Sequence, residues 1–524
     1  MQTLAFVHTQ HAWLPVATLA LLVWRLNAAT PGRAAWLAWC YGTAWLTAGT
    51  WWLFISLYRY GGLPAWMAVA AVLALAAALS LYLAVAGALY ARGRRGRALP
   101  DVFLFAGLWL LAEWARTVIF TGFPWVVSGY AQVDSVLAAW APWVGVLGMG
   151  ALAALVAAAL GHLLPAPGAP RLPGSTSTPD TLSTPGRPPR MVLALLITAV
   201  LLPGVFGPVS FTQPAGELSV RLLQTNVAQD EKFAAEHLPE TLSWVAQKLI
   251  DAGNPAPAAL SVAPETAVPL LPAQLADFAP GYWEQLRARF AAPGPSQGAA
   301  LVGVPLGDFD SGYTNSVIGL GSEPQLDIRA DGLYRYDKLH LVPFGEFVPT
   351  GFRWFTAMMN IPLGDFARGV RNPPSFQVAG QRVAPNICYE DLFGEELAAR
   401  FIDPALAPTV LANVSNIGWF GNTVAIPQHL AISRLRSLEF QRPMLRATNT
   451  GATAVVGHTG EVTAQLPPHT RGVLAAQVQG RSGTTPFAWW AARWSHWPWL
   501  VLGLSGALLL GRWRGAGGAL LGDG

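Results

Sequence analysis

The segment RVAPNICYED (382–391) passes from a short apolar run into polar and ionisable side chains at Cys388. A run of this length, rich in small and β-branched residues, predicts a buried strand. Similar runs lie along the same part of the chain: ELSVRLLQT (217–225), AALSVAPE (258–265), AALVGVPLG (299–307), YTNSVIGLG (313–321), PTVLANVSN (408–416) and TGATAVVGHTG (450–460). Helical patterns intervene at about 233–250, 281–291, 393–402 and 427–441. Strands that alternate with helices favour an α/β or layered α-β-β-α domain.

Three ionisable residues follow predicted strands in this domain. Glu265 follows SVAP, Lys338 follows YRYD and Cys388 follows VAPNI. A strand that feeds a loop is where a rigid scaffold presents reactive side chains. Each residue taken alone has a structural explanation: a cysteine packed in the core, a solvated glutamate, a surface lysine. The chain has only three lysines against 30 arginines, which mildly favours a special use of Lys338.

The regions that flank this domain are apolar and predict membrane spans. The whole chain of 524 residues is 53% hydrophobic and 12% charged, about half the charge of an ordinary soluble domain. A helix that crosses the hydrocarbon layer needs about 20 residues. Most of the apolar runs reach that length, and the first and last are short: 12–26, 34–58, 63–91, 102–120, 135–164, 191–211 and 498–511.

The charge distribution orients these spans. Residues 215–481 hold 24 acidic and 19 basic residues, whereas the rest of the chain holds 5 acidic and 14 basic ones. Arginine clusters follow the first, third, fifth and last apolar runs, and basic loops face the cytoplasm. We therefore expect the middle domain outside the cytoplasm and the C-terminus inside it. The Pro/Ser/Thr-rich stretch 165–190 is typical of a flexible cytoplasmic linker.

Several classes of protein are disfavoured by these patterns. The apolar composition excludes a disordered chain and a highly charged nucleic-acid binder. Two cysteines do not make a disulfide framework. His429 and His458 lack the spacing of metal ligands, and no phosphate-binding motif occurs, so we expect no metal and no cofactor.

Longer motifs resemble a known family. PET (264–266), YDKLHLVPFGEFVP (336–349) and NICYED (386–391) are similar to the Glu-Lys-Cys motifs of the nitrilase superfamily. Together with the spans, KLHLVPFGEFVP resembles the membrane-embedded apolipoprotein N-acyltransferase family. Further similar segments are EWARTVIFTGFPWVVSGYAQ (113–132), NVSNIGWFGNT (413–423) and QHLAISRLRSLEFQRPMLRATNTGATAVV (428–456). The resemblance covers the later spans and nearly all of the middle domain.

The resemblance implies an architecture and a location. Residues 1–211 would form a transmembrane helical bundle, residues 212–485 an extracytoplasmic nitrilase-like catalytic domain of the α-β-β-α type, and residues 486–524 a C-terminal transmembrane helix. The family usually has eight spans, so we expect its first span to lie upstream of Met1; the alternative is that the short first run, 12–26, does not cross the membrane. The chain departs from the family after Asn416, where Ile417 replaces a usual acidic residue. A multi-pass protein of the bacterial cytoplasmic (inner) membrane is expected.

The chemistry of the three ionisable residues agrees with the roles that the resemblance assigns. Glu265 can act as general base on the Cys388 thiol, because a free thiol is mostly protonated at neutral pH. Lys338 can stabilise both the thiolate and the oxyanion of a tetrahedral intermediate. A thioester on Cys388 would divide acyl transfer into two easier steps.

Five further residues are expected to support this triad. By resemblance, Glu346 is an additional essential carboxylate that orients Lys338 or holds an amine, although a structural contact in the turn after Gly345 is the alternative. Tyr389 and Glu390 follow the nucleophile and either shape its loop or are mainly structural. Asn413 and Ser415 follow another strand and are expected in the pocket wall.

Two features of the flanks point to lipid. Glu113 and Arg116 lie on one face of a helix, where they either pair or clamp a lipid headgroup. The apolar stretch 351–366 is interpreted as a membrane-dipping arm over the active site, with burial in the core as the alternative. Tryptophans at 489–499 fit an interfacial belt.

Three hypotheses for function remain from the sequence. The leading one is a ping-pong acyltransferase that takes an acyl chain from a phospholipid and gives it to a diacylated apolipoprotein acceptor, with the lipid bilayer as its environment and no nucleic acid. The second is a membrane-tethered amidase of nitrilase type. The third is a transporter or receptor whose external domain only binds, but the spans lack the broken-helix pattern of a transport path.

Overall fold

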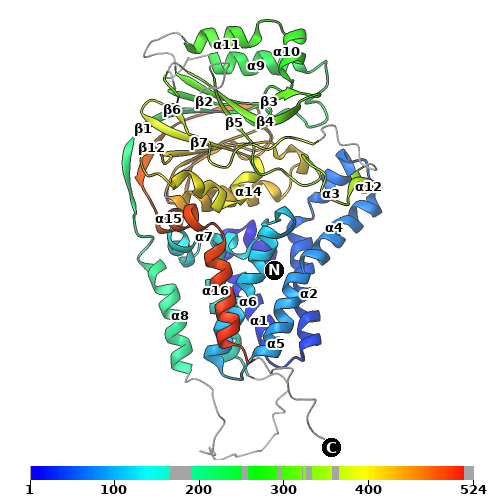
Figure 1. Ribbon diagram of the computed structural model, residues 1–524, viewed down its shortest axis with the longest axis vertical. Coiled ribbons are helices and arrows are strands. Elements are labelled where there is room, and N and C mark those ends of the chain that lie inside the picture. The colour runs from blue at the N-terminus through cyan, green and yellow to red at the C-terminus, as the bar shows by residue number, and fades with distance from the viewer. Residues whose placement is uncertain are drawn as a thin grey trace, which may run out of the picture.

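The structure is a computed structural model that describes residues 2–165, 190–250, 258–291, 298–321, 323–325, 333–356 and 365–512. A helical bundle forms one end of the molecule and a two-sheet domain forms the other (Figure 1). The main helices of the bundle are α1 (Trp13–Leu26), α2 (Pro31–Thr50), α4 (Ala65–Leu79), α5 (Leu81–Gly93), α6 (Ala98–Val118), α7 (Ala141–Leu163), α8 (Arg190–Val205) and α16 (Trp497–Leu510).

Among the described residues, three helical stretches are long and apolar enough to cross a membrane: Ala65–Gly93, Ala98–Thr121 and Val136–Leu163. Shorter apolar helices are Arg190–Val205 and Trp497–Leu510. Small residues let these helices approach closely. A methyl group on Gly87 of α5 would lie 2.8 Å from both the Ala34 carbonyl oxygen and the Ala38 side chain of α2. Such contacts replace the hydrophobic driving force that is missing between helices in lipid.

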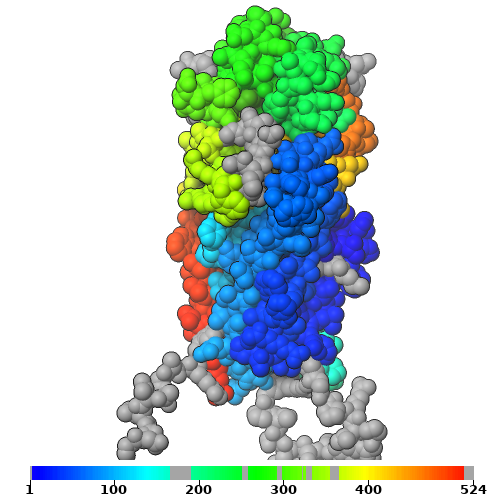
Figure 2. Space-filling model, turned by 90° about the vertical axis from the view of Figure 1, so that its right-hand side faces the viewer, coloured from blue at the N-terminus to red at the C-terminus, as the bar shows by residue number. Residues whose placement is uncertain are grey.

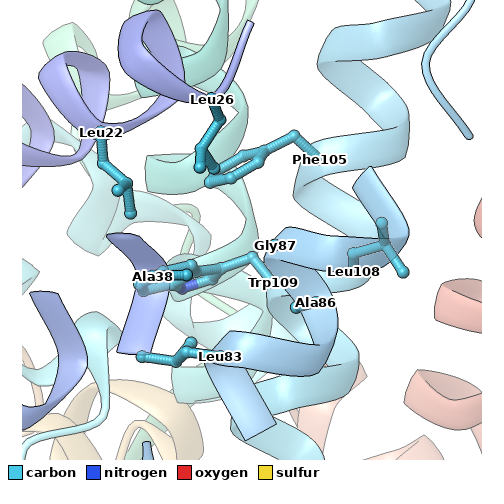
Figure 3. Close-up of a pocket in the computed structure, with 9 residues that line it drawn as sticks. All are labelled: Leu22, Leu26, Ala38, Leu83, Ala86, Gly87, Phe105, Leu108 and Trp109. Atoms are coloured by element: carbon cyan, nitrogen blue, oxygen red, sulfur yellow. The ribbon is translucent and has the colours of Figure 1, made fainter. Parts of the chain in front are cut away.

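A small apolar pocket lies among four of these helices (Figure 3). Its lining comes from α1, α2, α5 and α6: Leu22, Leu26, Ala38, Leu83, Ala86, Gly87, Phe105, Leu108 and Trp109. No side chain of the predicted site lines it, so we treat this pocket as a packing feature of the bundle.

Glu113 and Arg116 on α6 pair with each other, which was one of the two alternatives expected for them. Arg116 Nη2 lies 3.6 Å from Glu113 Oε1, and both side chains are buried. Glu113 also accepts hydrogen bonds of 2.7 Å from the backbone N–H and the hydroxyl of Ser128. The ion pair predicted on this helix face is confirmed.

The apolar run 34–58 is not one continuous helix, which corrects the sequence-based expectation. Helix α2 ends at Thr50, and a π-helical turn, η3 (Ser56–Tyr60), follows the short helix α3 (Leu53–Ile55). The segment η3 contacts the two-sheet domain at two points. Arg59 pairs with Asp230 at 2.8 Å, and the Tyr60 ring packs edge-on against the Trp419 ring. Figure 2 shows this part of the chain, in blue, rising beside yellow-green residues of the domain.

The described residues of the domain form two six-stranded sheets. The first has the order β12 (Gly472–Gly483), β1 (Thr212–Gln224), β2 (Leu260–Val262), β3 (Ala299–Asp308), β4 (Gly312–Leu320) and β5 (Tyr334–Asp337). The second has the order β11 (Val462–Gln465), β10 (Ala454–Val456), β9 (Met444–Thr448), β8 (Val410–Ser415), β7 (Gln381–Ile387) and β6 (Phe376–Val378). Strands β1 to β3 and strands β7 to β9 are parallel within their sheets.

Helices cover the outer face of each sheet. Buried residues of both sheets pack against each other in one core. A second core joins the first sheet to α9 (Leu238–Ile250), α10 (Pro272–Phe278) and α11 (Tyr282–Ala291). Helix α14 (Ala425–Phe440) lies between the second sheet and the bundle, with α15 (Pro486–Trp494) beside it (Figure 1). The expected architecture, an α-helical bundle with an α-β-β-α domain, is confirmed.

Candidate active site

The three predicted catalytic residues follow strands that end at the same edge of the sandwich. Glu265 follows β2, Lys338 follows β5 directly, and Cys388 follows β7 directly. Strand β5 is antiparallel to β4, which is antiparallel to β3, so β5 runs in the direction of β2 and β3. The chain therefore leaves β2 and β5 at the same end. Tertiary pairing thereby gathers side chains that are far apart in sequence.

The three side chains form one electrostatic cluster. Lys338 Nζ lies 3.6 Å from Glu265 Oε1. The charges of Glu265 and Lys338 both act on the Cys388 thiol. Lys338 is 1% exposed, so its ammonium group lies in a largely dehydrated cluster. Charge interactions in such surroundings are much stronger than in water.

Glu346 completes this cluster through Lys338 and Asn315. Its Oε1 lies 2.9 Å from Lys338 Nζ, and its Oε2 accepts a hydrogen bond of 2.8 Å from the Val342 N–H. Asn315 Nδ2 donates to Glu346 Oε1 at 2.8 Å and to Glu265 Oε1 at 2.7 Å. One amide group on β4 therefore holds both carboxylates at a fixed separation.

The other oxygen of Glu265 is held by the backbone. The Asn416 N–H donates to Glu265 Oε2 at 2.7 Å, and the Asn416 side chain donates to Gln229. Asn416 directly follows β8, so the loop that departs from the family pattern at Ile417 still supplies a donor to Glu265. Both oxygens of this buried carboxylate are satisfied, which fixes its orientation.

Cys388 stands at a sharp turn between β7 and a 3-10 turn, Cys388–Leu392. Its φ of 52° lies in the left-handed region, which non-glycine residues seldom adopt. Three donors surround it. Ser415 Oγ lies 3.4 Å from Sγ, and the carbonyl oxygen accepts from Asn413 Nδ2 at 3.1 Å and from His429 Nε2 at 3.2 Å. These contacts hold a strained backbone at the position of the thiol, where the charges of Glu265 and Lys338 act on it.

His429 is fixed from behind by a buried ion network. Its Nε2 faces Asp391 Oδ1 at 2.9 Å as well as the Cys388 carbonyl, so this nitrogen carries the hydrogen. Its Nδ1 faces Arg446 Nη2 at 3.2 Å and accepts from it. Arg446 also pairs with Asp391. The histidine acts through the backbone of Cys388.

The electrostatics keep the nucleophile protonated at rest. Burial, reinforced by the charge of Glu265, raises the pKa of the Cys388 thiol to about 12, against the opposing charge of Lys338. Burial alone would lower the pKa of Lys338, but the carboxylates of Glu346 and Glu265 outweigh it and raise that pKa above its ordinary value. A thiolate therefore forms only when a base beside it takes the proton.

Glu390 joins the Lys338 loop to the Cys388 loop. It accepts hydrogen bonds from the N–H groups of Ile387 and Leu339 and from the Tyr336 hydroxyl, at 2.6, 2.7 and 2.6 Å. Burial raises the pKa of Glu390. The neighbouring Tyr389 points the other way, toward the bundle, where its hydroxyl donates to the Gly122 carbonyl at 3.2 Å.

All eight predicted site residues lie in this region, and the structure adds partners that sequence patterns missed. Asn315, Asn416, His429 and Lys232 were not assigned to the site. Asn315 carried a weak signal, because it is a polar residue inside the apolar strand YTNSVIGLG. Residues 357–364 of the expected arm and 166–189 of the expected linker lie outside the described residues. Phe352 and Trp354, at the start of the arm, are exposed.

Comparisons with known proteins agree with the two-part architecture. The family model described as "Apolipoprotein N-acyltransferase N-terminal domain" matches residues 1–159, and the one described as "Carbon-nitrogen hydrolase" matches residues 220–487. A curated apolipoprotein N-acyltransferase from Verminephrobacter eiseniae is 50% identical and is aligned over 92% of this chain and 88% of its own length. The apolipoprotein N-acyltransferase from Ralstonia nicotianae is 45% identical and is aligned over 93% of this chain and 87% of its own length. The one from Bordetella bronchiseptica is 43% identical and is aligned over 91% of this chain and 89% of its own length.

Proposed function

We propose, on the premise that this chain belongs to the apolipoprotein N-acyltransferase family, a route by which it acylates lipoproteins. Membership makes the chain an acyltransferase and a bacterial membrane protein. The donor is a membrane phospholipid, and the acceptor is the α-amino group of the N-terminal S-diacylglyceryl-cysteine. Cys388 carries the acyl chain between them in a ping-pong reaction. The observation that supports this route best is the buried cluster of Glu265, Lys338 and Cys388.

The first half of the reaction loads the acyl chain. Glu265 takes the proton from Cys388 Sγ, and the thiolate attacks the carbonyl carbon of the phospholipid ester. The negative charge on the carbonyl oxygen develops beside Lys338, whose ammonium group stabilises it. The tetrahedral intermediate collapses, the C–O bond breaks, and the leaving alkoxide takes the proton from Glu265. A lysophospholipid departs and a thioester remains on Cys388.

The second half transfers the chain to the amine. The neutral α-amino group attacks the thioester carbonyl carbon, and Glu265 accepts the proton that the nitrogen loses. The C–S bond breaks, and Cys388 leaves as a thiolate and recovers the proton from Glu265. The product is an amide, and the enzyme returns to its resting protonation state. One base and one cation serve both halves, because both pass through similar oxyanions.

The supporting residues have positioning roles in this proposal. Glu346 holds Lys338 toward the reacting carbonyl, with Asn315 fixing its distance from Glu265. Glu390 keeps the Lys338 and Cys388 loops in register. Tyr389 anchors the nucleophile turn to the bundle, and Asn413 and Ser415 hold the turn from β8: Asn413 bonds the Cys388 carbonyl and Ser415 the thiol.

The same proposal includes the membrane arrangement. Residues 1–211 and 486–524 form the inner-membrane part, and residues 212–485 form the catalytic domain on the extracytoplasmic side. Contacts between the site and the bundle support a reaction at the bilayer surface. Beside the Tyr389 contact with Gly122, His340 Nε2 lies 3.0 Å from the Thr121 carbonyl oxygen, in the loop after α6. A phospholipid ester can reach such a site without leaving the membrane.

Amide hydrolysis is a second candidate, favoured by the carbon-nitrogen hydrolase match over residues 220–487. Water would then replace the amine as the acceptor. A small soluble amide needs neither the bundle nor its contacts with the nucleophile turn. Hydrolysis of a small soluble amide to its carboxylic acid, with no acyl transfer to a diacylated lipopeptide, would favour this candidate.

Intact-protein mass spectrometry tests the route directly. After incubation with phospholipid vesicles, the protein should gain the mass of one fatty acyl chain, and hydroxylamine should remove it. Cys388→Ala should gain nothing, whereas Cys40→Ala, which removes the other cysteine, should behave like the unchanged protein. Adding a diacylated lipopeptide should discharge the adduct and yield the triacylated product. An active protein that never carries the adduct would refute the covalent route.

A further inference from the structure

A second lysine lies beneath the triad. Lys232 follows β1 and is 5% exposed. Its Nζ donates to the Glu265 carbonyl oxygen at 3.0 Å and to the hydroxyl of Thr266. Burying an ammonium group is costly unless it has polar partners. The partners of Lys232 are Glu265, which is the proposed base, and the adjacent Thr266. None of the steps proposed above uses Lys232.

The turn that Lys232 holds is strained. Thr266 has a φ of 46°, a left-handed conformation that is unfavourable for a β-branched residue. On the other side, Gly303 of β3 packs against the same turn: a methyl group there would lie 2.3 Å from the Pro264 carbonyl oxygen and 2.8 Å from Glu265 Cα. The turn is therefore confined between a lysine and a glycine, and its conformation sets the direction of the Glu265 carboxylate.

Lys232 also balances the charge of the cluster. Glu265 and Glu346 bring two negative charges and Lys338 brings one positive charge, so the ammonium group of Lys232 makes the sum zero while Cys388 is a thiol. When Glu265 takes the proton of Cys388, the negative charge moves to sulfur and the sum does not change. Without Lys232 the cluster would carry a net negative charge, which opposes the formation of a thiolate.

We propose that Lys232 is a positioning residue of the acyl-transfer site: its ammonium group fixes the turn that directs Glu265 and neutralises the cluster in which the Cys388 thiolate forms. This inference rests on the proposed function. The residue acts through Glu265 and through its field, and it touches no reacting atom. A lysine suits the position, because a compact ammonium group can donate to a carbonyl and a hydroxyl at once.

The proposal predicts a definite pH dependence. Burial lowers the pKa of Lys232 to about 8, against the opposing charges of Glu265, on the loop after β2, and Cys388, after β7. Asp230 and Glu231 precede Lys232 in its own segment, and Asp230 is paired with Arg59. Lys232 is therefore charged below about pH 8 and loses its charge above it. Its support for the thiolate should fade over the same range.

The test measures the thiolate without any acyl donor, so it is independent of the proposed reaction. In a Cys40→Ala background, iodoacetamide alkylates Cys388 at a rate that reports its thiolate. Lys232→Met removes the charge and the donors, and Lys232→Gln removes the charge but keeps an N–H donor. Lys248→Met, on α9, is the matched control for the loss of a lysine. Thioester formation from phospholipid is measured on the same proteins.

We expect Lys232→Met and Lys232→Gln to alkylate about tenfold more slowly than the parent at pH 7, the effect of one pKa unit. The difference should shrink above pH 8, and Lys248→Met should match the parent. Thioester formation should fall about 100-fold in Lys232→Met, where the base is also misdirected, and less in Lys232→Gln.

Other outcomes overturn the inference. Equal alkylation profiles would show that the charge does not act on Cys388. Faster alkylation would show that the substitution merely opens the site. If both variants fail to fold while Lys248→Met folds, Lys232 serves the fold and the inference is wrong. If the variants differ from the parent in alkylation as predicted but the parent forms no thioester, the proposed function is refuted. The electrostatic role of Lys232 is then still supported.

Discussion

Replacing Asn315 by leucine removes an amide that donates to two carboxylates at once. Its Nδ2 lies 2.7 Å from Glu265 Oε1 and 2.8 Å from Glu346 Oε1, on a side chain that is 3% exposed. Leucine has the same branching at Cγ and cannot donate. Glu265 would keep the Asn416 N–H, and Glu346 would keep the Val342 N–H and Lys338.

The size of the effect follows from these contacts. A hydrogen bond to a charged group contributes about 1.5–3 kcal/mol. Loss of one such bond at Glu265 corresponds to about a 10- to 150-fold slower reaction if the bond matters only for directing the base. Glu265 would also be free to move toward Lys338, which is already 3.6 Å away, and a closer ion pair would make it a poorer base. We therefore expect thioester formation to fall about 100-fold.

The assay is the rate of acyl-adduct formation on Cys388, followed by intact-mass spectrometry in one turnover. Thr314→Val is the matched control. Thr314 is the neighbouring residue on β4 and is also buried, and its hydroxyl contacts Ser316 and Asp337 with no carboxylate of the site among its partners. It should react at nearly the parent rate. A folded Asn315→Leu protein within about threefold of the parent, or a Thr314→Val protein that is equally slow, would refute the role given to Asn315.

Three further changes test other parts of the structure. Gly303→Ala should slow thioester formation at least tenfold with little change in the thermal unfolding temperature of the bundle, because its methyl group displaces the Glu265 turn; an unchanged rate would contradict the tight packing found there. Asp391→Asn should lower the free energy of unfolding by about 3–5 kcal/mol at pH 7, because it leaves Arg446 buried without its carboxylate. Although burial alone would raise the pKa of Asp391, His429 and Arg446 hold it below its ordinary value, so the stabilisation is present above about pH 4 and is lost as the pH falls below it. Thermal unfolding of parent and variant should therefore converge in acid, and a constant difference down to pH 3 would count against this network. Gln428→Leu should lower the free energy of unfolding by about 1–3 kcal/mol, because it leaves the buried indole N–H of Trp125 without its acceptor and loosens the domain from the bundle, whereas the Trp52 indole N–H keeps the Gly49 carbonyl oxygen; stability equal to the parent would refute this contact.

The positions of the strands and of the apolar helices could be predicted largely from sequence because each depends on local composition. Short β-rich runs in the middle domain became β1 to β4, β7, β8 and β10, and long apolar runs became helices of the bundle. Strand β9, MLRAT, was missed because Arg446 interrupts its apolar pattern. That arginine is 1% exposed, and its charge is accepted by Asp391 from another segment. The end of the run 34–58 was also misjudged, because Trp52 is buried against Trp125 of the bundle and Phe420 of the domain.

The residues of the site also fall into those that the sequence could predict and those that it could not. Glu265, Lys338 and Cys388 could be named because a strand end displays a reactive residue and because their motifs resemble a family. Asn315, Asn416, His429 and Lys232 could not. Each acts through contacts with strands or loops that are remote in the sequence, and nothing in the neighbouring sequence signals those contacts.

The amino-acid sequence by itself determined which segments are apolar enough to enter a bilayer, which are short enough to be strands, and which residues can serve as nucleophile, base and cation. Those properties belong to individual side chains and their near neighbours. Only the tertiary structure decided that two carboxylates share one amide, that a second lysine lies under the base, and that a strained cysteine rests on a histidine from α14. These depend on distances between segments that are remote in the chain, and such distances exist only once two sheets and a helical bundle have packed together.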